Sequence, residues 1–201
     1  MDVIRVCSSE GFRLLITTRF SMAPWLTSDS DVDYRISKAS AAFCALSNVL
    51  RNKGVSDHLK GEVYKALVLS TFLHGCGVWC LREELTNRLR FFHKRCVHCM
   101  CRVSLHYSFH HHISSATLFQ RPNVMDIDSY YHNRIILWAG HVAWTLMIRA
   151  PRQLLTGWVA HSWPNGCTEM KWGRTLKKAR KFKGLPANFK EWRAIAEDRS
   201  D

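Results

Sequence analysis

The sequence predicts an all-α fold, a multi-helix bundle followed by a basic, partly irregular C-terminal tail. In four stretches apolar residues recur three and four positions apart, which is the spacing of one helix face. Residues that suit helix caps separate these stretches. The 201-residue chain is 47% hydrophobic, so it has enough apolar side chains to bury a sizeable core. These three observations favour packed helices over a disordered chain.

The first helix is predicted over residues 32–52, and the segment before it carries only a weak signal. In that segment, residues 14–16 suggest a short strand, and residues 27–31 suggest a turn and a helix start. Gly54 is expected to end the helix, because glycine adopts the left-handed conformation without steric cost. The apolar stripe of this helix consists of Ile36, Ala39, Phe43, Leu46 and Leu50.

The second helix is predicted to begin after Ser56, which suits an N-cap, and to stop at the glycines on either side of Cys76. Its expected apolar face consists of Leu59, Val63, Ala66, Leu67, Ser70 and Leu73. A third helix is predicted over residues 83–103, with a strongly basic exposed side. Its expected buried face consists of Leu85, Leu89, Phe92, Cys96 and Cys99.

A His-rich connector over residues 106–112 is expected to follow the third helix. A short helical piece over residues 114–119 should come next, ended by Pro122. The fourth clear helix is predicted over residues 126–144. The residues that follow its period are Ile127, Tyr130, Tyr131, Arg134, Leu137, Trp138, His141 and Val142.

The composition changes after Pro151. Residues 157–171 are rich in Trp, Gly and Pro and are interpreted as a linker, and a last short helix is predicted over residues 187–198. The chain is therefore expected to contain a poorly defined joint over residues 1–31 and a helical domain over residues 32–150. A basic linker with a short C-terminal helix should occupy residues 151–201.

The charge balance favours a polyanionic partner. Lys and Arg number 29 against 16 acidic residues, a formal net charge of +13, so RNA or DNA is the simplest partner. The densest basic tract follows Trp172 and includes Phe182, a combination that suits phosphate contact and base stacking. A solvated linker or a localisation tract is the alternative. The basic residues of this tract are Arg174, Lys177, Lys178, Arg180, Lys181 and Lys183.

The sequence contains no motif for phosphoryl transfer or nucleotide binding, and no Cys/His pair stands out for nucleophilic catalysis. The acidic cluster Asp29, Asp31 and Asp33 precedes a predicted helix and is expected to cap it. A zinc site is conceivable, but two of its cysteines fall on an expected apolar stripe, which favours buried thiols. No metal or other cofactor is therefore expected. The four residues considered as zinc ligands are Cys96, Cys99, His110 and His112.

Residues 66–81 form the longest apolar run, and it is interrupted by His74 and two glycines, so no membrane span is predicted. The N-terminal residues lack the clean apolar stretch of a signal peptide. The 8 cysteines are then expected to be thiols in a reducing compartment. These features indicate an intracellular protein of the nucleus or cytoplasm, and the sequence does not specify its oligomeric state.

Six motifs along the chain resemble, in order, the region downstream of the palm in LINE-type (non-LTR) retrotransposon reverse transcriptases. The resemblance covers about residues 27–200, and the order of the motifs makes it specific. The motifs lie at residues 34–43, at residues 63–76 with Trp79 following, and at residues 91–96, 138–142, 150–155 and 192–200.

The resemblance implies a thumb-like domain and C-terminal region that grip a primer–template duplex without reading its sequence. The chain would then not be an enzyme on its own. Its parent would be an RNA-directed DNA polymerase whose palm uses Mg²⁺. Basic helix faces suit such a grip through phosphate contacts. Besides the basic tract, the expected contacts are Arg35, Lys38, Arg88, Lys94 and Arg95.

The chain also departs from the family pattern. The aromatic-Ala-Asp-Asp turn of the palm is absent, and Cys99, Cys101 and residues 106–112 replace other family residues. These departures indicate a truncated or degenerate copy. Two alternatives stay open: a retroelement relic without a selected function, and a zinc-binding helical interaction module. An independent Cys hydrolase is a remote third.

Overall fold

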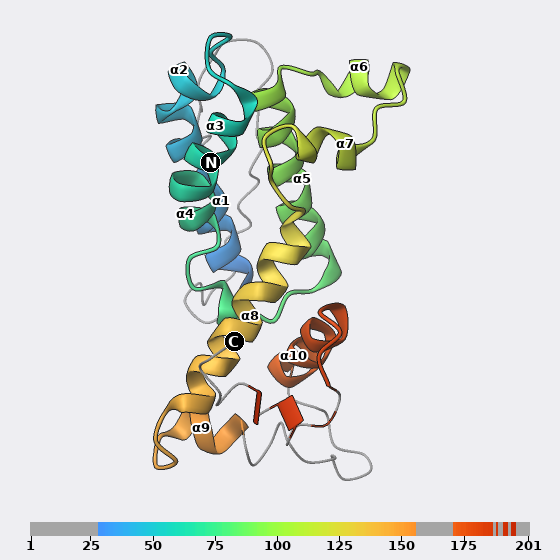
Figure 1. Ribbon diagram of the computed structural model, residues 1–201. Coiled ribbons are helices and arrows are strands. Elements are labelled where there is room, and N and C mark those ends of the chain that lie inside the picture. The colour runs from blue at the N-terminus through green and yellow to red at the C-terminus, as the bar shows by residue number, and fades with distance from the viewer. Residues whose placement is uncertain (1–27, 156–170, 187, 189–190, 193, 196–201) are drawn as a thin grey trace. The chain divides into compact units, whose positions relative to one another are not determined.

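The computed structural model describes residues 28–155, 171–186, 188, 191–192 and 194–195. Within these ranges the chain is helical and has no strand, which confirms the all-α prediction (Figure 1). The elements are α1 (Ser28–Ala45), α2 (Ser47–Leu50), α3 (Asp57–Val63), the π-helix η1 (Tyr64–Leu69), α4 (Ser70–Phe72), the 3-10 turn η2 (Cys76–Val78), α5 (Glu83–Cys101), α6 (Leu105–His110), α7 (Ser115–Gln120), α8 (Ile127–Trp144), α9 (Ala150–Leu154) and α10 (Lys171–Phe182).

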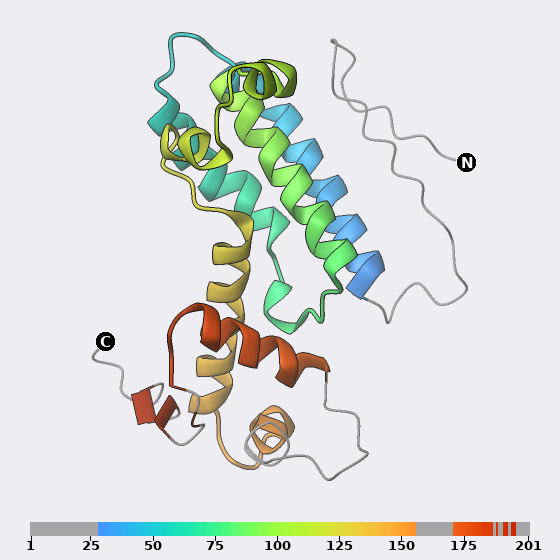
Figure 2. The ribbon, with the colours of Figure 1, turned by 90° about the vertical axis from the view of Figure 1, so that its right-hand side faces the viewer.

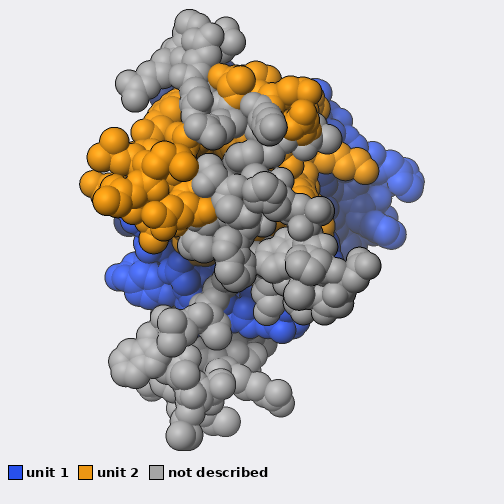
Figure 3. All heavy atoms as spheres, turned by 90° about the horizontal axis from the view of Figure 1, so that it is seen from below, with its two compact units in different colours: residues 1–74, 82–127 blue, residues 75–81, 128–201 orange. Residues whose placement is uncertain are grey.

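Two compact units make up the fold (Figure 3). Unit 1 takes the chain up to His74 together with Arg82–Ile127, and unit 2 takes Gly75–Leu81 together with the chain from Asp128 onward. The compact units therefore divide at other positions than the predicted segments 1–31, 32–150 and 151–201. That three-part division stays a prediction about domain organisation.

The core of unit 1 lies between α1, α5 and the helical stretch from α3 through η1 to α4. Helices α1 and α5 run side by side (Figure 2). Phe43 packs edge-on against Tyr64, and Phe72 lies against Phe92 with ring centroids 4.8 Å apart. Each large apolar side chain buried in this way contributes about 1.5–3 kcal/mol. The buried residues of α1 and α2 include Val32, Ile36, Ala39, Phe43 and Leu50, and those of α5 include Leu85, Leu89, Phe92 and Cys96.

The first predicted helix forms, but its end is not where the sequence suggested. Helix α1 starts at Ser28 with Asp29 and Asp31 in its first turn, where acidic side chains complement the helix dipole. The helical path ends with α2 at Leu50, before Gly54, and Gly54 does not adopt a positive φ. The expectation that Gly54 caps this helix was wrong. The chain turns instead through a loop in which the Gly54 amide donates to the side chain of Asn52 at 2.8 Å.

The second predicted helix has the correct start, but of the residues expected on its buried face only Leu73 is buried. Ser56 caps it as expected, since its Oγ accepts a hydrogen bond from the Leu59 amide at 3.3 Å. Leu59 and Leu67 were expected inside, but they are 53% and 51% exposed. Gly61 faces the core, so close to the Pro122 backbone that an added Cβ would lie 1.8 Å from the carbonyl oxygen. The face buried here consists of Lys60, Gly61, Tyr64, Val68, Leu69, Phe72 and Leu73.

The segment between α5 and α8 is more helical than expected. The predicted His-rich connector begins with α6, which Ser104 caps by accepting from the Tyr107 amide at 3.0 Å. The prediction of a connector over the whole of residues 106–112 was therefore wrong, because Ser104 caps a helical turn that begins at Leu105. The short helix predicted at residues 114–119 is confirmed as α7, capped by Ser114.

Helix α8 confirms the fourth predicted helix, although its buried face differs in part from the expected one. Tyr131 and Val142 are buried as expected, whereas Leu137 is 66% exposed. Ile135 and Ala139 are buried in its place. None of the helices that the structure describes is long and apolar enough to cross a membrane.

Three expectations concern residues outside the described ranges. The short strand at residues 14–16 and residues 157–170 of the predicted linker lie there. The last predicted helix, residues 187–198, lies partly outside them; of its described residues, Glu191, Trp192, Ala194 and Ile195 are helical, whereas Asn188 lies in a bend.

Candidate nucleic-acid interface

Helix α10 carries the most concentrated positive charge among the described helices. Six of its 12 residues are basic and none is acidic. Leu176 and Ala179 are wholly buried, so α10 is a packed helix of unit 2. Its exposed face carries a basic side chain at positions i, i+3, i+4 and i+7, a spacing that places all four on the side opposite the buried stripe. These exposed residues are Arg174, Lys177, Lys178 and Lys181.

Aromatic side chains hold α10 in place within unit 2. Trp172 donates its indole Nε1–H to the Gly77 carbonyl at 2.8 Å and packs edge-on against Trp138, with centroids 5.0 Å apart. At the other end of the helix, the centroids of the Phe182 and His132 rings are 4.6 Å apart. Gly77 is needed for this arrangement, because a Cβ there would lie 2.7 Å from the Trp138 Cβ. The basic face is therefore fixed by packing against α8 and η2.

Arg180 belongs to the predicted basic tract, but it lies on the buried side of α10. Its side chain is 6% exposed, and its guanidinium lies 5.9 Å from the centroid of the Trp192 ring. Burial lowers the pKa of this guanidinium, and its Nε and Nη1 atoms are buried without a hydrogen-bond partner. A cation over an indole face contributes attraction to packing. The structure therefore places Arg180 as an anchor of α10 and not on the exposed face.

Lys183 follows the last turn of α10 and is exposed. Its ammonium lies 6.0 Å from the centroid of the Phe182 ring, and Phe182 itself is 51% exposed. The end of α10 therefore presents a cation and an aromatic ring together. This pairing is the one that the sequence suggested for phosphate contact with base stacking.

Two of the three arginines predicted as contacts in unit 1, Arg35 and Arg88, are paired with carboxylates. Asp31 Oδ1 lies 3.3 Å from Arg35 Nε, and Asp33 pairs with Arg88. A half-exposed ion pair of this kind is worth about 0–1 kcal/mol, so a phosphate could displace it, but the carboxylate left behind would repel the phosphate. Asp31 and Asp33 thus serve as counter-charges to these arginines. The four-residue spacing of Asp31 and Arg35 is a sequence signal for the first of these pairs.

The remaining cations predicted in unit 1 are spread over two helices. Lys38 is exposed on α1, and its ammonium lies 5.4 Å from the centroid of the Tyr34 ring. Lys94 and Arg95 are half-buried on α5, and the Arg95 guanidinium lies 5.6 Å from the centroid of the Phe91 ring. None of these helices collects four exposed cations on one face as α10 does.

The residues considered as zinc ligands do not meet. Cys96 is wholly buried, and burial raises the pKa of its thiol well above its ordinary value, which disfavours the thiolate that zinc requires. Cys99 accepts a hydrogen bond from Arg51 Nε at 3.1 Å. His110 ends α6, and His112 lies beyond it. Over the ranges that the structure covers, no group of three or more His, Cys, Asp or Glu is placed to hold a metal.

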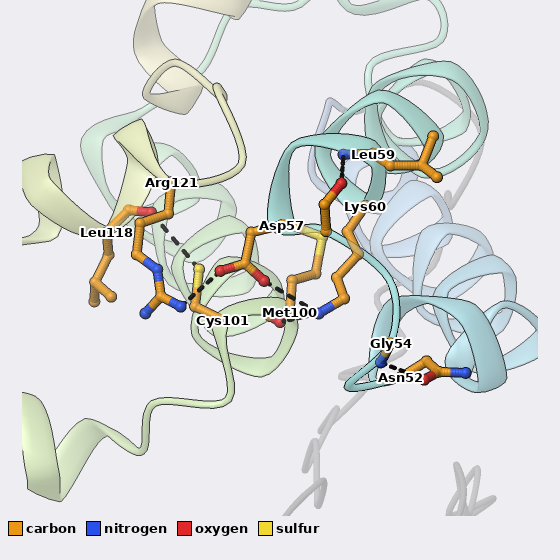
Figure 4. Close-up of polar contacts among 10 residues, drawn as sticks. Asn52, Gly54, Asp57, Leu59, Lys60, Met100, Cys101, Leu118 and Arg121 are labelled. Carbon is orange, nitrogen blue, oxygen red and sulfur yellow. Dashed lines mark hydrogen bonds and ion pairs between the residues drawn. The ribbon is translucent and has the colours of Figure 1, made fainter.

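A buried polar network in unit 1 was not foreseen from the sequence. Lys60 is wholly buried, and its ammonium donates to Asp57 Oδ1 at 3.1 Å and to the Met100 carbonyl at 3.3 Å (Figure 4). Asp57 also accepts from Arg121 Nη2 at 2.6 Å. The spacing of Asp57 and Lys60 permits this pair, but nothing local marks the lysine as buried. The network ties together α3, the end of α5 and the residue after α7.

A second buried network fixes the state of one histidine. Tyr64 Oη lies 2.9 Å from His93 Nδ1, and His93 Nε2 lies 3.0 Å from the Met125 carbonyl oxygen. A carbonyl only accepts, so Nε2 donates to it, and in the neutral ring Nδ1 then accepts from the tyrosine hydroxyl. Both rings are wholly buried, and the arrangement satisfies their polar atoms.

Protein-family models, curated proteins and solved structures contain no match to this chain.

Proposed function

We propose that this chain binds RNA or DNA without reading its sequence, and that the exposed face of α10 is the contact surface. The observation that carries the proposal is the alignment of Arg174, Lys177, Lys178 and Lys181 on one face of a helix that contains no carboxylate. Contacts of this type to phosphate fix position and affinity, and they carry no sequence information.

The dimensions of this face suit a phosphate backbone. Arg174 and Lys181 are separated along the helix axis by about 10 Å, because an α-helix rises ~1.5 Å per residue. That length corresponds to roughly three nucleotide steps of one strand at ~3.4 Å each. The exposed Phe182 and Lys183 extend the same end of the helix with a ring and a further cation.

We further propose that the chain derives from the thumb and C-terminal region of a LINE-type reverse transcriptase. The support is the ordered series of six motifs, together with a helical fold of the kind that the resemblance implies. In the parent protein a palm with an Asp-Asp turn would polymerise with Mg²⁺, and this chain would hold the duplex. On this proposal the chain alone does not polymerise.

Salt-dependent binding of the full chain to labelled duplex DNA, RNA–DNA hybrid and single-stranded RNA tests the proposal. Fluorescence anisotropy would be compared for wild type and three double variants, each of which removes two positive charges. The first is Lys178→Gln/Lys181→Gln on α10, and the second is Lys38→Gln/Lys94→Gln in unit 1. The third, Lys53→Gln/Arg149→Gln, is the matched control at exposed positions outside the predicted contacts.

Of the three double variants, we expect only the α10 variant to weaken binding, and we expect it to do so for nucleic acids of every sequence. The slope of log K against log salt should become shallower by about 1.8 for duplex DNA, because each phosphate contact contributes ~0.9. An equal loss in the control variant would attribute binding to net charge, and the α10 interface would be wrong. A larger loss in the unit 1 variant would move the interface to α1 and α5. No binding by wild type at low salt would contradict the proposal as a whole.

A further inference from the structure

Helix α6 presents two histidines whose ring nitrogens converge. His106 and His110 are four positions apart and therefore lie on one face of the helix. Their Nε2 atoms are 3.0 Å apart and their ring centroids 4.2 Å apart. Both side chains are exposed, so an ion can reach the point between them from solvent.

The separation of the two nitrogens matches that of two ligands on one metal ion. Imidazole nitrogens bind transition metals at about 2.0–2.1 Å, which places two of them ~2.9 Å apart at a right angle and ~3.4 Å apart at the tetrahedral angle. The observed 3.0 Å, which is also the length of the hydrogen bond between the two rings, lies within a few tenths of an ångström of both values, so small ring rotations bring both nitrogens onto one ion. Among divalent ions that favour imidazole, Cu²⁺ and Ni²⁺ are suitable probes of such a pair.

We propose that His106 and His110 form a two-imidazole chelate for a divalent transition metal such as Cu²⁺ or Ni²⁺. In the metal-free pair one Nε2 donates its proton to the other, because each neutral ring has one N–H. With the metal bound, both Nε2 lone pairs face the ion and both rings carry their proton on Nδ1. Water completes the coordination, since two protein ligands leave positions open.

The local fold supports this pair and separates it from the neighbouring histidines. Ser104 caps α6 and fixes the helical turn that brings the two rings together. His111 points along another face and stacks on Tyr107, with centroids 4.1 Å apart. His112 lies past the end of the helix with a φ of 52°. The site thus differs from the four-ligand zinc site considered from the sequence, and it shares no residue with α10.

The test uses the full chain without a polyhistidine tag, titrated with Ni²⁺ by calorimetry and with substoichiometric Cu²⁺ by electron paramagnetic resonance. Wild type, His106→Gln, His110→Gln and the matched control His111→Gln would be compared. All four proteins share the same thiols, so differences between them report the imidazoles. Far-UV circular dichroism would establish that each variant keeps its helix content.

We expect wild type and His111→Gln to bind one ion, with two imidazole nitrogens in the Cu²⁺ spectrum. His106→Gln and His110→Gln should each lose that ion. Unchanged binding in either of these two variants would overturn the proposal. A loss of metal binding in His111→Gln as large as that in His110→Gln would also overturn the proposal, because binding would then not be specific to the pair four positions apart.

Discussion

Removing the carboxylate of Asp57 should destabilise unit 1 far more than removing the ammonium that it binds. Lys60 is wholly buried, with Asp57 and the Met100 carbonyl as its hydrogen-bond acceptors. Asp57→Ala would leave the ammonium buried with one neutral acceptor. Lys60→Met would instead fill the same space with an apolar chain, and Asp57 would keep its ion pair with Arg121.

The two substitutions should differ by several kcal/mol. Breaking a buried pair from one side costs about 3–5 kcal/mol, whereas exchanging the buried ion for an apolar side chain of similar volume is often neutral or stabilising. We therefore expect Asp57→Ala to lower the free energy of unfolding by about 3–5 kcal/mol. Lys60→Met should stay within about 1 kcal/mol of wild type, the net worth of a hydrogen bond. Against a total stability of about 5–15 kcal/mol, the first effect is large.

Urea denaturation at pH 7, followed by far-UV circular dichroism, measures both effects. The midpoint of Asp57→Ala should fall clearly, and that of Lys60→Met should remain near the wild-type value. If Lys60→Met were as damaging as Asp57→Ala, the cost would lie in lost packing or in the lysine's own bonds. The reasoning from an uncompensated buried charge would then be refuted.

The pH dependence of this difference has a definite sign. Burial acts to raise the pKa of Asp57, but the hydrogen bond from Lys60 and the charges of Arg121 and Lys60 outweigh it and hold the pKa below the ordinary 3.8. A carboxyl with a lowered pKa in the folded state contributes stability that is complete above its unfolded pKa. That stability is lost as the pH falls through the folded value. The gap between wild type and Asp57→Ala should therefore narrow below about pH 4.

Two further predictions concern close packing and thiol burial. Gly61→Ala should cost about 1–3 kcal/mol, because its Cβ would meet the Pro122 carbonyl oxygen at 1.8 Å. Gly54→Ala is the matched control and should be near neutral in the same urea assay, because the nearest atom to its Cβ is 3.4 Å away. The Cys76 thiol is buried, which raises its pKa to about 12, so iodoacetamide at pH 8 should label it far more slowly than the half-buried Cys99. Peptide mass spectrometry would measure both rates, and equal rates would contradict the burial of Cys76.

Local signals in the sequence predicted where several helices lie. Ser56 and Ser114 each precede a helix and accept a hydrogen bond from its first turn, so these starts were readable from a few residues. Helices α5 and α8 carry long periodic apolar patterns, and both formed near the expected positions. Existence and start of a helix depend mostly on nearby residues, which explains these successes.

The buried faces depended on contacts that are distant along the chain. Gly61 lies against the Pro122 backbone, and the buried Lys60 ammonium donates hydrogen bonds to the Met100 carbonyl and to Asp57. Neither partner across the core can be identified from the pattern of the second helix alone. The expected apolar face included Leu59, which is exposed. Lys60 and Gly61, the next two residues, are buried in its place. Tertiary packing thus selected a different face of a correctly predicted helix.

The basic tract shows how a helix separates the roles of residues that look alike in sequence. Lys178, Arg180 and Lys181 are consecutive or nearly so, and all three were expected to contact phosphate. Once α10 forms, its period sends Arg180 to the side of Leu176 and leaves both lysines in solvent. Charge density alone predicts attraction to a polyanion, but only the helical phase determines which cations are available to it. The four aligned cations therefore form the surface to test, and Arg180 belongs to the packing that holds them in place.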